Sequence, residues 1–226
     1  MNLQQVIGQE IYDLLYKHCD ANGHLIEDME DVLYCDDRDI DQERISELEV
    51  LLVPITSAQD SLIPIEASKT LAAWGSKKAI EYLEFCIDER IDCLGNLDPH
   101  RIHGDYDTTY ERMVDSLFQY YTRYTERDYA ISNTYHGELA EKAKNKINAP
   151  LVKIITLSKE LTLDMGYLIK VLKHESWKEY LPTLKECYLD FMQRPEKDLN
   201  RQWNLLALTE LLNEWDPDFL TTNKVK

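Results

Sequence analysis

Apolar residues recur every three or four positions along most of the chain, which is the spacing of one helix face. Helices of this kind are expected near the N-terminus, where Asn22-Gly23 ends the first one, over the short stretch from Ile26 to Leu33, and from Ile45 to Leu52, where Pro54 stops the helix. Strand-like alternation never persists beyond a few residues. The first helix face carries six such positions: Val6, Ile7, Ile11, Leu14, Leu15 and His18. The pattern therefore predicts an all-α protein.

The second half of the chain continues in the same way. A long apolar and aromatic stripe runs from Tyr110 to Tyr124, and a further helix is expected over residues 139–147. We expect Pro150 in the first turn of the next helix, because proline lacks the amide donor that an inner turn requires. Helices continue as far as Trp215, and a short tail covers residues 216–226.

The clearest pair of helices lies in residues 63–90. Small residues and leucine precede Gly75, and a second helix starts again at once. Two helices joined by so tight a turn lie antiparallel. This segment resembles a HEAT-type repeat unit, in which the matching positions are Ala67, Leu71, Ala72, Ala73 and Gly75 in the first helix and Ala79 and Leu83 in the second. The resemblance implies one all-α domain over residues 1–226, built as an irregular HEAT-like stack of antiparallel helix pairs, with helices over 108–215.

The amount and distribution of charge indicate what kind of partner the protein binds. The 226 residues carry a formal net charge of −17, and the acids are concentrated at one end. Residues 1–53 hold 14 acids and three bases, whereas residues 136–226 hold 14 of each. Such a surface repels phosphate backbones and anionic lipids, so we expect no direct binding of nucleic acid or membrane. A basic protein partner is the natural complement.

The cysteines and the N-terminus indicate an intracellular protein. Five cysteines are widely spaced with no Cys-x-x-Cys pair, which disfavours a disulfide scaffold or a structural zinc site. The first residues lack the basic and apolar regions of a signal peptide, and the longest apolar run is too short to span a bilayer. We expect a cytoplasmic location.

Candidate chemistry is sparse. Asp37-x-Asp39-x-Asp41 has the opening spacing of a calcium loop, but Gln42 replaces the sixth-position glycine and Leu48 the final glutamate. His100-x-x-His103, with Asp105 and Asp107 nearby, offers too few convergent ligands for zinc. No nucleophile elbow or glycine-rich phosphate loop occurs. We therefore expect no enzyme activity, no metal and no cofactor.

Recognition rests on two clusters. Residues 26–49 hold eleven acids against Arg38 and Arg44, and this cluster is either a solvated surface or a surface that steers a cationic partner. Seven of the 14 tyrosines lie between Tyr106 and Tyr135. Most of these suit the edge of a core, and the exposed ones suit a binding hot spot. The candidate partner-binding residues are Asp36, Asp37, Asp39, Asp41, Glu43, Tyr106, Tyr110, Tyr120 and Tyr124.

In architecture and charge the chain is similar to bacterial immunity proteins of contact-dependent growth inhibition and related polymorphic toxin systems. The resemblance implies a non-catalytic inhibitor that binds and neutralises a cognate basic toxin domain, such as a nuclease. Two alternatives remain open: a general protein-binding adaptor of HEAT-like type, and a metal-dependent hydrolase that uses the loop from His100 to Asp107.

Overall fold

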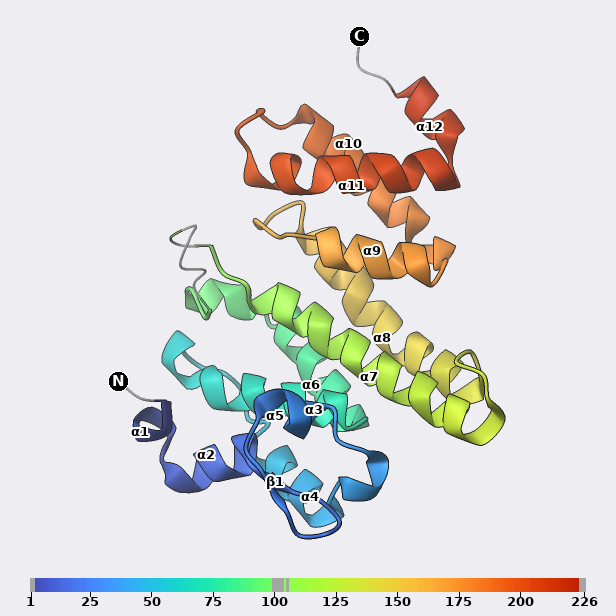
Figure 1. The fold of residues 1–226 in the computed structure, drawn as a ribbon. Helices are drawn as coiled ribbons and strands as arrows, with labels where there is room; N and C mark the ends of the chain where they lie inside the picture. The colour runs from blue at the N-terminus through green and yellow to red at the C-terminus, as the bar shows by residue number, and fades with distance from the viewer. Residues whose placement is uncertain (1–2, 99–103, 105, 224–226) are drawn as a thin grey trace. The chain divides into compact units, whose positions relative to one another are not determined.

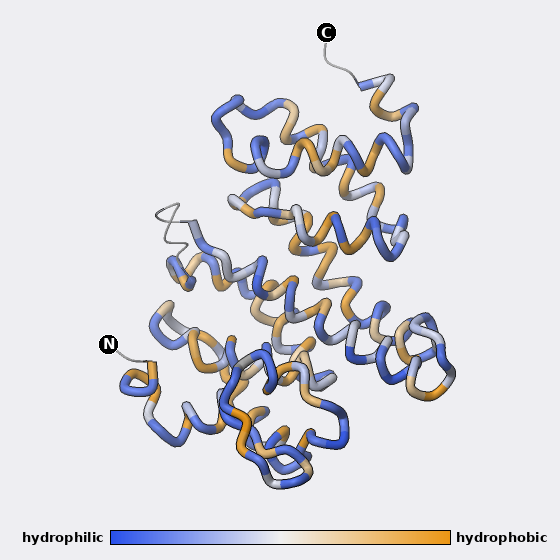
Figure 2. The backbone as a smooth tube through the Cα atoms, viewed as in Figure 1, coloured by the Kyte–Doolittle hydropathy of each residue, from blue (hydrophilic) through white to orange (hydrophobic). Residues whose placement is uncertain are grey.

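The computed structural model describes residues 3–98, 104 and 106–223. Within these residues the protein is all-α, and its one sheet is a two-stranded hairpin. Figure 1 shows the helices in chain order, and Figure 2 shows apolar and polar positions alternating along them. None of the described helices is long and apolar enough to cross a membrane.

The chain divides into two compact units. Unit 1 comprises Met1–Asp98 and Asp115–Pro150, and unit 2 comprises Pro99–Val114 and Leu151–Lys226. The long helices α7, Thr109–Ser132, and α8, Glu138–Leu157, contribute residues to both units. The single repeat domain over 1–226 stays a prediction, because compact units within a helical stack need not be separate domains.

Unit 1 begins with short elements that surround a central helix. In chain order its elements before α7 are α1 Leu3–Ile7, α2 Gln9–Tyr16, β1 His18–Cys19, β2 Leu25–Ile26, α3 Met29–Leu33, the 3-10 turn η1 Asp37–Asp39, α4 Gln42–Val50, η2 Ala58–Asp60, α5 Leu62–Ala73, α6 Lys77–Asp88 and η3 Ile91–Leu94. Helix α5 packs against α2, α3, α4 and α6. It is apolar on almost every side, and a helix of that kind has to be buried all round.

The expected helix pair over residues 63–90 is confirmed as α5 and α6. Gly75, at φ +82°, ends α5 in the left-handed conformation that glycine adopts without steric cost. The Gly75 N–H donates to the Ala72 carbonyl at 2.9 Å, and the Ser76 N–H donates to the Leu71 carbonyl at 2.8 Å. This two-bond cap turns the chain into α6 within three residues. The HEAT-like arrangement of the whole chain stays a prediction.

The single N-terminal helix expected through His18 is wrong. The helix is interrupted at Gly8, α2 ends at Tyr16, and His18 begins a strand that pairs antiparallel with β2. The Asp20 carboxylate accepts hydrogen bonds from the backbone N–H groups of Asn22 and His24, both at 2.8 Å. This local bonding favours a hairpin turn over another helical turn.

The break expected at Pro150 is also wrong, because α8 runs through it without interruption. A proline inside a helix removes one backbone hydrogen bond and costs about 3 kcal/mol. Ile147, Leu151 and Ile154 flank Pro150 and are completely buried. Burial of these side chains on both sides of the proline outweighs its local cost.

Unit 2 is a set of helices built around α11. Its elements after α8 are α9 Gly166–His174, η4 Lys178–Tyr180, α10 Leu181–Gln193, α11 Leu199–Trp215 and α12 Pro217–Thr222. Helix α11 packs against α9, α10 and α12. Two buried asparagines on one face of α11, Asn200 and Asn204, accept hydrogen bonds from the N–H groups of Leu163 and Met165, each at 2.7 Å. These side chains hold the segment between α8 and α9 in place.

Candidate functional site

The acidic cluster of residues 26–49 lies in unit 1, on α3, η1, α4 and their flanking loops. Some of its charge serves local structure. Asp28 caps α3 by accepting from the Glu30 N–H at 2.9 Å, and Asp41 caps α4 by accepting from the Glu43 N–H at 2.9 Å. Neither bond neutralises the carboxylate, so both residues remain negative at the surface.

The five predicted acids have different environments. Asp41 and Glu43 are exposed, as is Asp36, which pairs with the exposed Arg38 at 3.2 Å. Asp39 is largely covered and accepts from the Ala21 N–H at 2.9 Å, so it links η1 to the hairpin. Three of the five acids therefore present an exposed carboxylate to solvent: Asp36, Asp41 and Glu43.

Asp37 already forms an ion pair with another part of the chain, and its predicted contact with a partner stays a prediction. Its two carboxylate oxygens accept from Arg127 on α7 at 2.7 and 2.8 Å, and Arg123 lies 3.7 Å away. Partial burial opposes ionisation, but the two guanidinium groups outweigh it and lower the pKa of Asp37. The residue ties the acidic segment to α7.

The four predicted tyrosines are not one exposed patch. Tyr110 and Tyr120 are only 5% and 1% exposed, so the expectation that they meet a partner is wrong. Tyr124 is half-buried beneath Arg127, and its hydroxyl donates to the Gly75 carbonyl at 3.0 Å. Tyr106 belongs to unit 2, where its ring packs edge-on against Trp203 at 5.0 Å. Helical rotation buries the tyrosines that share the apolar stripe of α7.

Sequence reasoning missed the tyrosines that are exposed. Tyr129 and Tyr135 stack on each other in unit 1 with ring centroids 4.4 Å apart and planes at 10°. Tyr34 and Tyr167 are also exposed. The position of Tyr129 off the apolar stripe of α7 could have indicated that it is exposed. Its stacking on Tyr135, across a turn, has no sequence signature.

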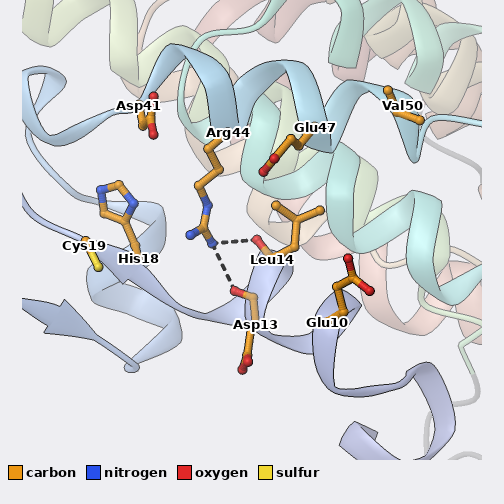
Figure 3. Close-up of a pocket in the computed structure, with 9 residues that line it drawn as sticks. All are labelled: Glu10, Asp13, Leu14, His18, Cys19, Asp41, Arg44, Glu47 and Val50. Atoms are coloured by element: carbon orange, nitrogen blue, oxygen red, sulfur yellow. Dashed lines mark hydrogen bonds between the residues drawn. The ribbon is translucent and has the colours of Figure 1, made fainter.

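A hollow of about 650 Å³ opens in unit 1 between α2, β1 and α4, as Figure 3 shows. Four carboxylates from segments more than 25 residues apart reach its wall, and Arg44 is the one lysine or arginine among its lining residues. The wall is formed by Glu10, Asp13, Leu14, His18, Cys19, Asp41, Arg44, Glu47 and Val50. The fold thus gathers acids that sequence reasoning did not connect, because Glu10 and Asp13 lie outside residues 26–49.

Arg44 holds α4 against the end of α2. Its Nη2 donates to the Leu14 carbonyl at 2.5 Å and contacts the Asp13 carbonyl at 3.5 Å (Figure 3). Its guanidinium carbon also lies 5.5 Å from the centre of the Trp74 ring. Carbonyls in the last turn of a helix attract cations, so Arg44 is committed to the backbone of α2. In the part of the chain that the structure describes, Glu10, Asp41 and Glu47 form no ion pair.

His18 is buried in the wall of this hollow. It is 2% exposed, and its ring lies 5.3 Å from the Trp74 ring. Burial, reinforced by the charge of Arg44, lowers the pKa of His18 below its ordinary 6.5 and keeps the imidazole neutral at pH 7. Its Nε2 atom makes no hydrogen bond within the described residues.

A second hollow in unit 1, of about 480 Å³, surrounds the Asp37 clamp and is lined by Tyr34, Asp36, Asp37, Arg38, Arg123, Glu126, Arg127 and Ala130. Its three acids face three arginines. Arg123 is buried and donates to the carbonyls of Ala73 at 2.8 Å and Leu33 at 3.3 Å. The charges of this hollow balance, and Arg123 and Arg127 are already hydrogen-bonded within the chain. The hollow around Arg44 has an excess of acids instead.

The described residues contain no group of three or more histidine, cysteine, aspartate or glutamate side chains placed to hold a metal ion. His100, His103 and Asp105 lie outside those residues. Asp107 is described, and its carboxylate accepts from the Thr109 N–H at 2.8 Å, at the start of α7. Of the candidate metal ligands in that loop, Asp107 alone lies among the described residues, and it has a structural role.

Comparison with known proteins identified no relative: no family model, no curated protein and no solved structure matches the chain.

Proposed function

We propose that the protein binds a basic partner protein through the acidic surface of unit 1. In its most specific form, the proposal is that it acts as an immunity protein that neutralises a cognate basic toxin domain, such as a nuclease, without catalysis. The contacts come from the exposed acids Asp36, Asp41 and Glu43 and from the hollow beside them.

The convergence of Glu10, Asp41 and Glu47 on one hollow, without ion pairs, supports this proposal most strongly. Carboxylates that share a concave wall repel each other and reinforce one another's potential. Solubility alone needs acids that are dispersed. A cationic partner turns this unfavourable arrangement into complementary contacts and accelerates encounter, with on-rates raised about 10–10³-fold by fields of this kind.

The first test measures association with a defined candidate: a basic toxin domain encoded next to the gene for this chain. The purified proteins are mixed, and the association rate is measured between low and high ionic strength. We expect the rate to fall steeply as salt increases, because screening shortens the range of surface charge to about 10 Å at 0.1 M. A rate that does not change with salt contradicts the role of the acidic surface.

A charge-neutral variant adds a matched comparison. Asp36→Asn combined with Glu43→Gln removes two exposed charges from the surface, and Glu196→Gln combined with Glu210→Gln removes two exposed charges from unit 2. We expect the first pair to slow association about tenfold and the second pair to have little effect. Protection of nucleic acid from the toxin domain then separates an inhibitor from an adaptor, which binds without protecting.

A further inference from the structure

The turn that joins β1 to β2 contains the sequence Asn22-Gly23. Both residues are exposed, and a Cβ at Gly23 would meet no atom within 4 Å. The side-chain amide carbon of an asparagine lies within reach of the next backbone nitrogen. Glycine obstructs an approach between these two atoms least, because it has no side chain and the widest backbone freedom. The hairpin therefore presents a chemically labile pair of residues at the surface of unit 1.

The hydrogen bonds of Asp20 restrain this pair. The N–H of Gly23 donates to the Asp20 carbonyl at 2.9 Å. The side-chain amide of Asn22 donates to the Asp20 carboxylate at 3.4 Å, and that carboxylate also accepts from the backbone N–H groups of Asn22 and His24, both at 2.8 Å. The Asp20 N–H in turn donates to the His24 carbonyl at 3.0 Å, which closes a three-residue loop with Gly23 at φ +81°. Asp20 thus binds both the backbone nitrogen of Gly23 and the side-chain amide of Asn22.

We propose that Asn22 is a site of spontaneous deamidation and that the Asp20 turn, residues 20–24, controls its rate. The Gly23 nitrogen gives its proton to hydroxide and attacks Cγ of Asn22. A new C–N bond closes a cyclic imide, while the Cγ–Nδ2 bond breaks and Nδ2 leaves as ammonia after taking a proton from water. Water then opens the ring at one of its two carbonyls, giving aspartate or isoaspartate. One water is consumed and one ammonia is released, and nothing is oxidised or reduced.

The modification changes both the charge and the backbone of the hairpin. Either product adds a negative charge to the end of the chain that is already most acidic. Isoaspartate also adds one methylene to the main chain of a turn that joins two paired strands. In that turn the Ala21 N–H donates to the Asp39 carboxylate at 2.9 Å, which links the hairpin to η1. A longer main chain displaces this N–H, so we expect deamidation to loosen the contact between the hairpin and the acidic segment.

The first test incubates the full chain at pH 8, folded in buffer and unfolded in guanidinium chloride. Mass spectrometry of the peptide containing Asn22 measures the rate, and enzymatic detection of isoaspartate identifies the product. We expect the unfolded chain to deamidate Asn22 before its other asparagines. The folded chain should react more slowly by about tenfold or more, because the reaction then requires local opening of the turn. An unmodified Asn22 in the unfolded chain, or equal rates in the two states, overturns the proposal.

Asn148 is an internal control. It is exposed and is followed by the small residue Ala149, but it lies within α8, where the next backbone N–H is committed to the helix. We expect Asn148 to stay unmodified in the folded chain while Asn22 reacts. Faster deamidation at Asn148 than at Asn22 in the folded chain contradicts the assignment of the site.

A variant of Asp20 tests whether the turn controls the rate. Asp20→Ala removes the carboxylate and leaves Asn22-Gly23 intact, whereas Glu43→Ala removes an exposed acid of α4 that lies outside the turn. We expect Asp20→Ala to accelerate deamidation of the folded chain about tenfold, because hydrogen bonds to a charged acceptor no longer oppose opening. Glu43→Ala should keep the wild-type rate. Equal acceleration by both variants overturns control by the turn.

Circular dichroism confirms that the variants keep the helix content of the wild type. If Asp20→Ala does not fold, Asp20→Asn replaces it, since its side-chain oxygen still accepts hydrogen bonds but carries no charge. We then expect a smaller acceleration. A rate equal to that of the wild type in the folded variant overturns the role of Asp20.

Discussion

Asp37 and Arg127 lie 90 residues apart in the chain and form a two-point ion pair, with N–O distances of 2.7 and 2.8 Å. The carboxylate and guanidinium face each other as parallel forks, the strongest geometry for such a pair. The pair joins η1, in the middle of the acidic segment, to the C-terminal half of α7. A residue selected from the sequence as a partner contact is thus a structural clamp.

Replacing Asp37 with asparagine should destabilise the protein by about 1 kcal/mol at pH 7, a value reduced for solvent screening because the side chain is about half exposed. The pKa of Asp37 is lowered in the folded state, so its contribution is present above the ordinary value of 3.8 and is lost as pH falls below it. Urea unfolding at pH 7 and pH 3 checks this. Asp36→Asn is the control, and an equal loss in both variants contradicts the clamp.

Replacing Asn204 with alanine should destabilise unit 2 by about 2–3 kcal/mol, because it leaves two buried backbone groups without partners. The Asn204 side chain accepts from the Met165 N–H and donates to the Leu163 carbonyl, at 2.7 and 2.8 Å. Hydrogen exchange at Met165 should also become faster. Gln202→Ala, on an exposed position of the same helix, is the control and should change little.

Replacing Gly75 with alanine should destabilise the protein by about 2 kcal/mol, from left-handed strain and a steric conflict together. A Cβ at this position lies 2.6 Å from Nη1 of Arg127, so the guanidinium must move away from Asp37. Gly23→Ala has similar strain but open space around it. Thermal melts of the two variants should therefore differ; equal losses contradict a coupling between Gly75 and Arg127.

His18 should make stability depend on pH. Its pKa is lowered in the folded state, so the unfolded chain takes up a proton first as pH falls below 6.5. The melting temperature should decrease between pH 7 and pH 5, and His18→Phe should remove that part of the decrease while keeping an aromatic ring beside Trp74. His174→Gln, at an exposed site, is the control and should retain the wild-type slope.

The cysteines should react in two classes. Cys19 and Cys93 are exposed, whereas Cys35, Cys86 and Cys187 are buried. Burial raises the pKa of Cys35 and of Cys86 to about 11, which removes the reactive thiolate at neutral pH. Mass spectrometry after brief iodoacetamide treatment of the native protein should find label on Cys19 and Cys93 first. Equal labelling of Cys86 contradicts the packing of α6.

Local chemistry made much of the fold predictable. The α5–α6 pair follows from an apolar helix, a glycine in the left-handed conformation and an immediate second helix, all within about 25 residues. Gly8 and the Asp20 turn overrode helical periodicity at the N-terminus, because a short polar side chain competes locally with helical bonding. At Pro150 the opposite happened: burial on both sides of the proline overcame a local breaker.

The candidate site was only partly predictable, because charge and side-chain type say nothing about pairing across the fold. The periodicity of apolar positions predicted that the chain is helical, and the positions of its charged residues showed that it is acidic and most acidic in residues 1–53. Tertiary packing decided that Asp37 binds Arg127, that Tyr120 enters the core, and that Glu10 and Glu47 line the same hollow. The physical reason is distance in the sequence. Helical propensity depends on neighbouring residues, and net charge needs only a count of residues. A binding surface, in contrast, depends on contacts between residues far apart in sequence.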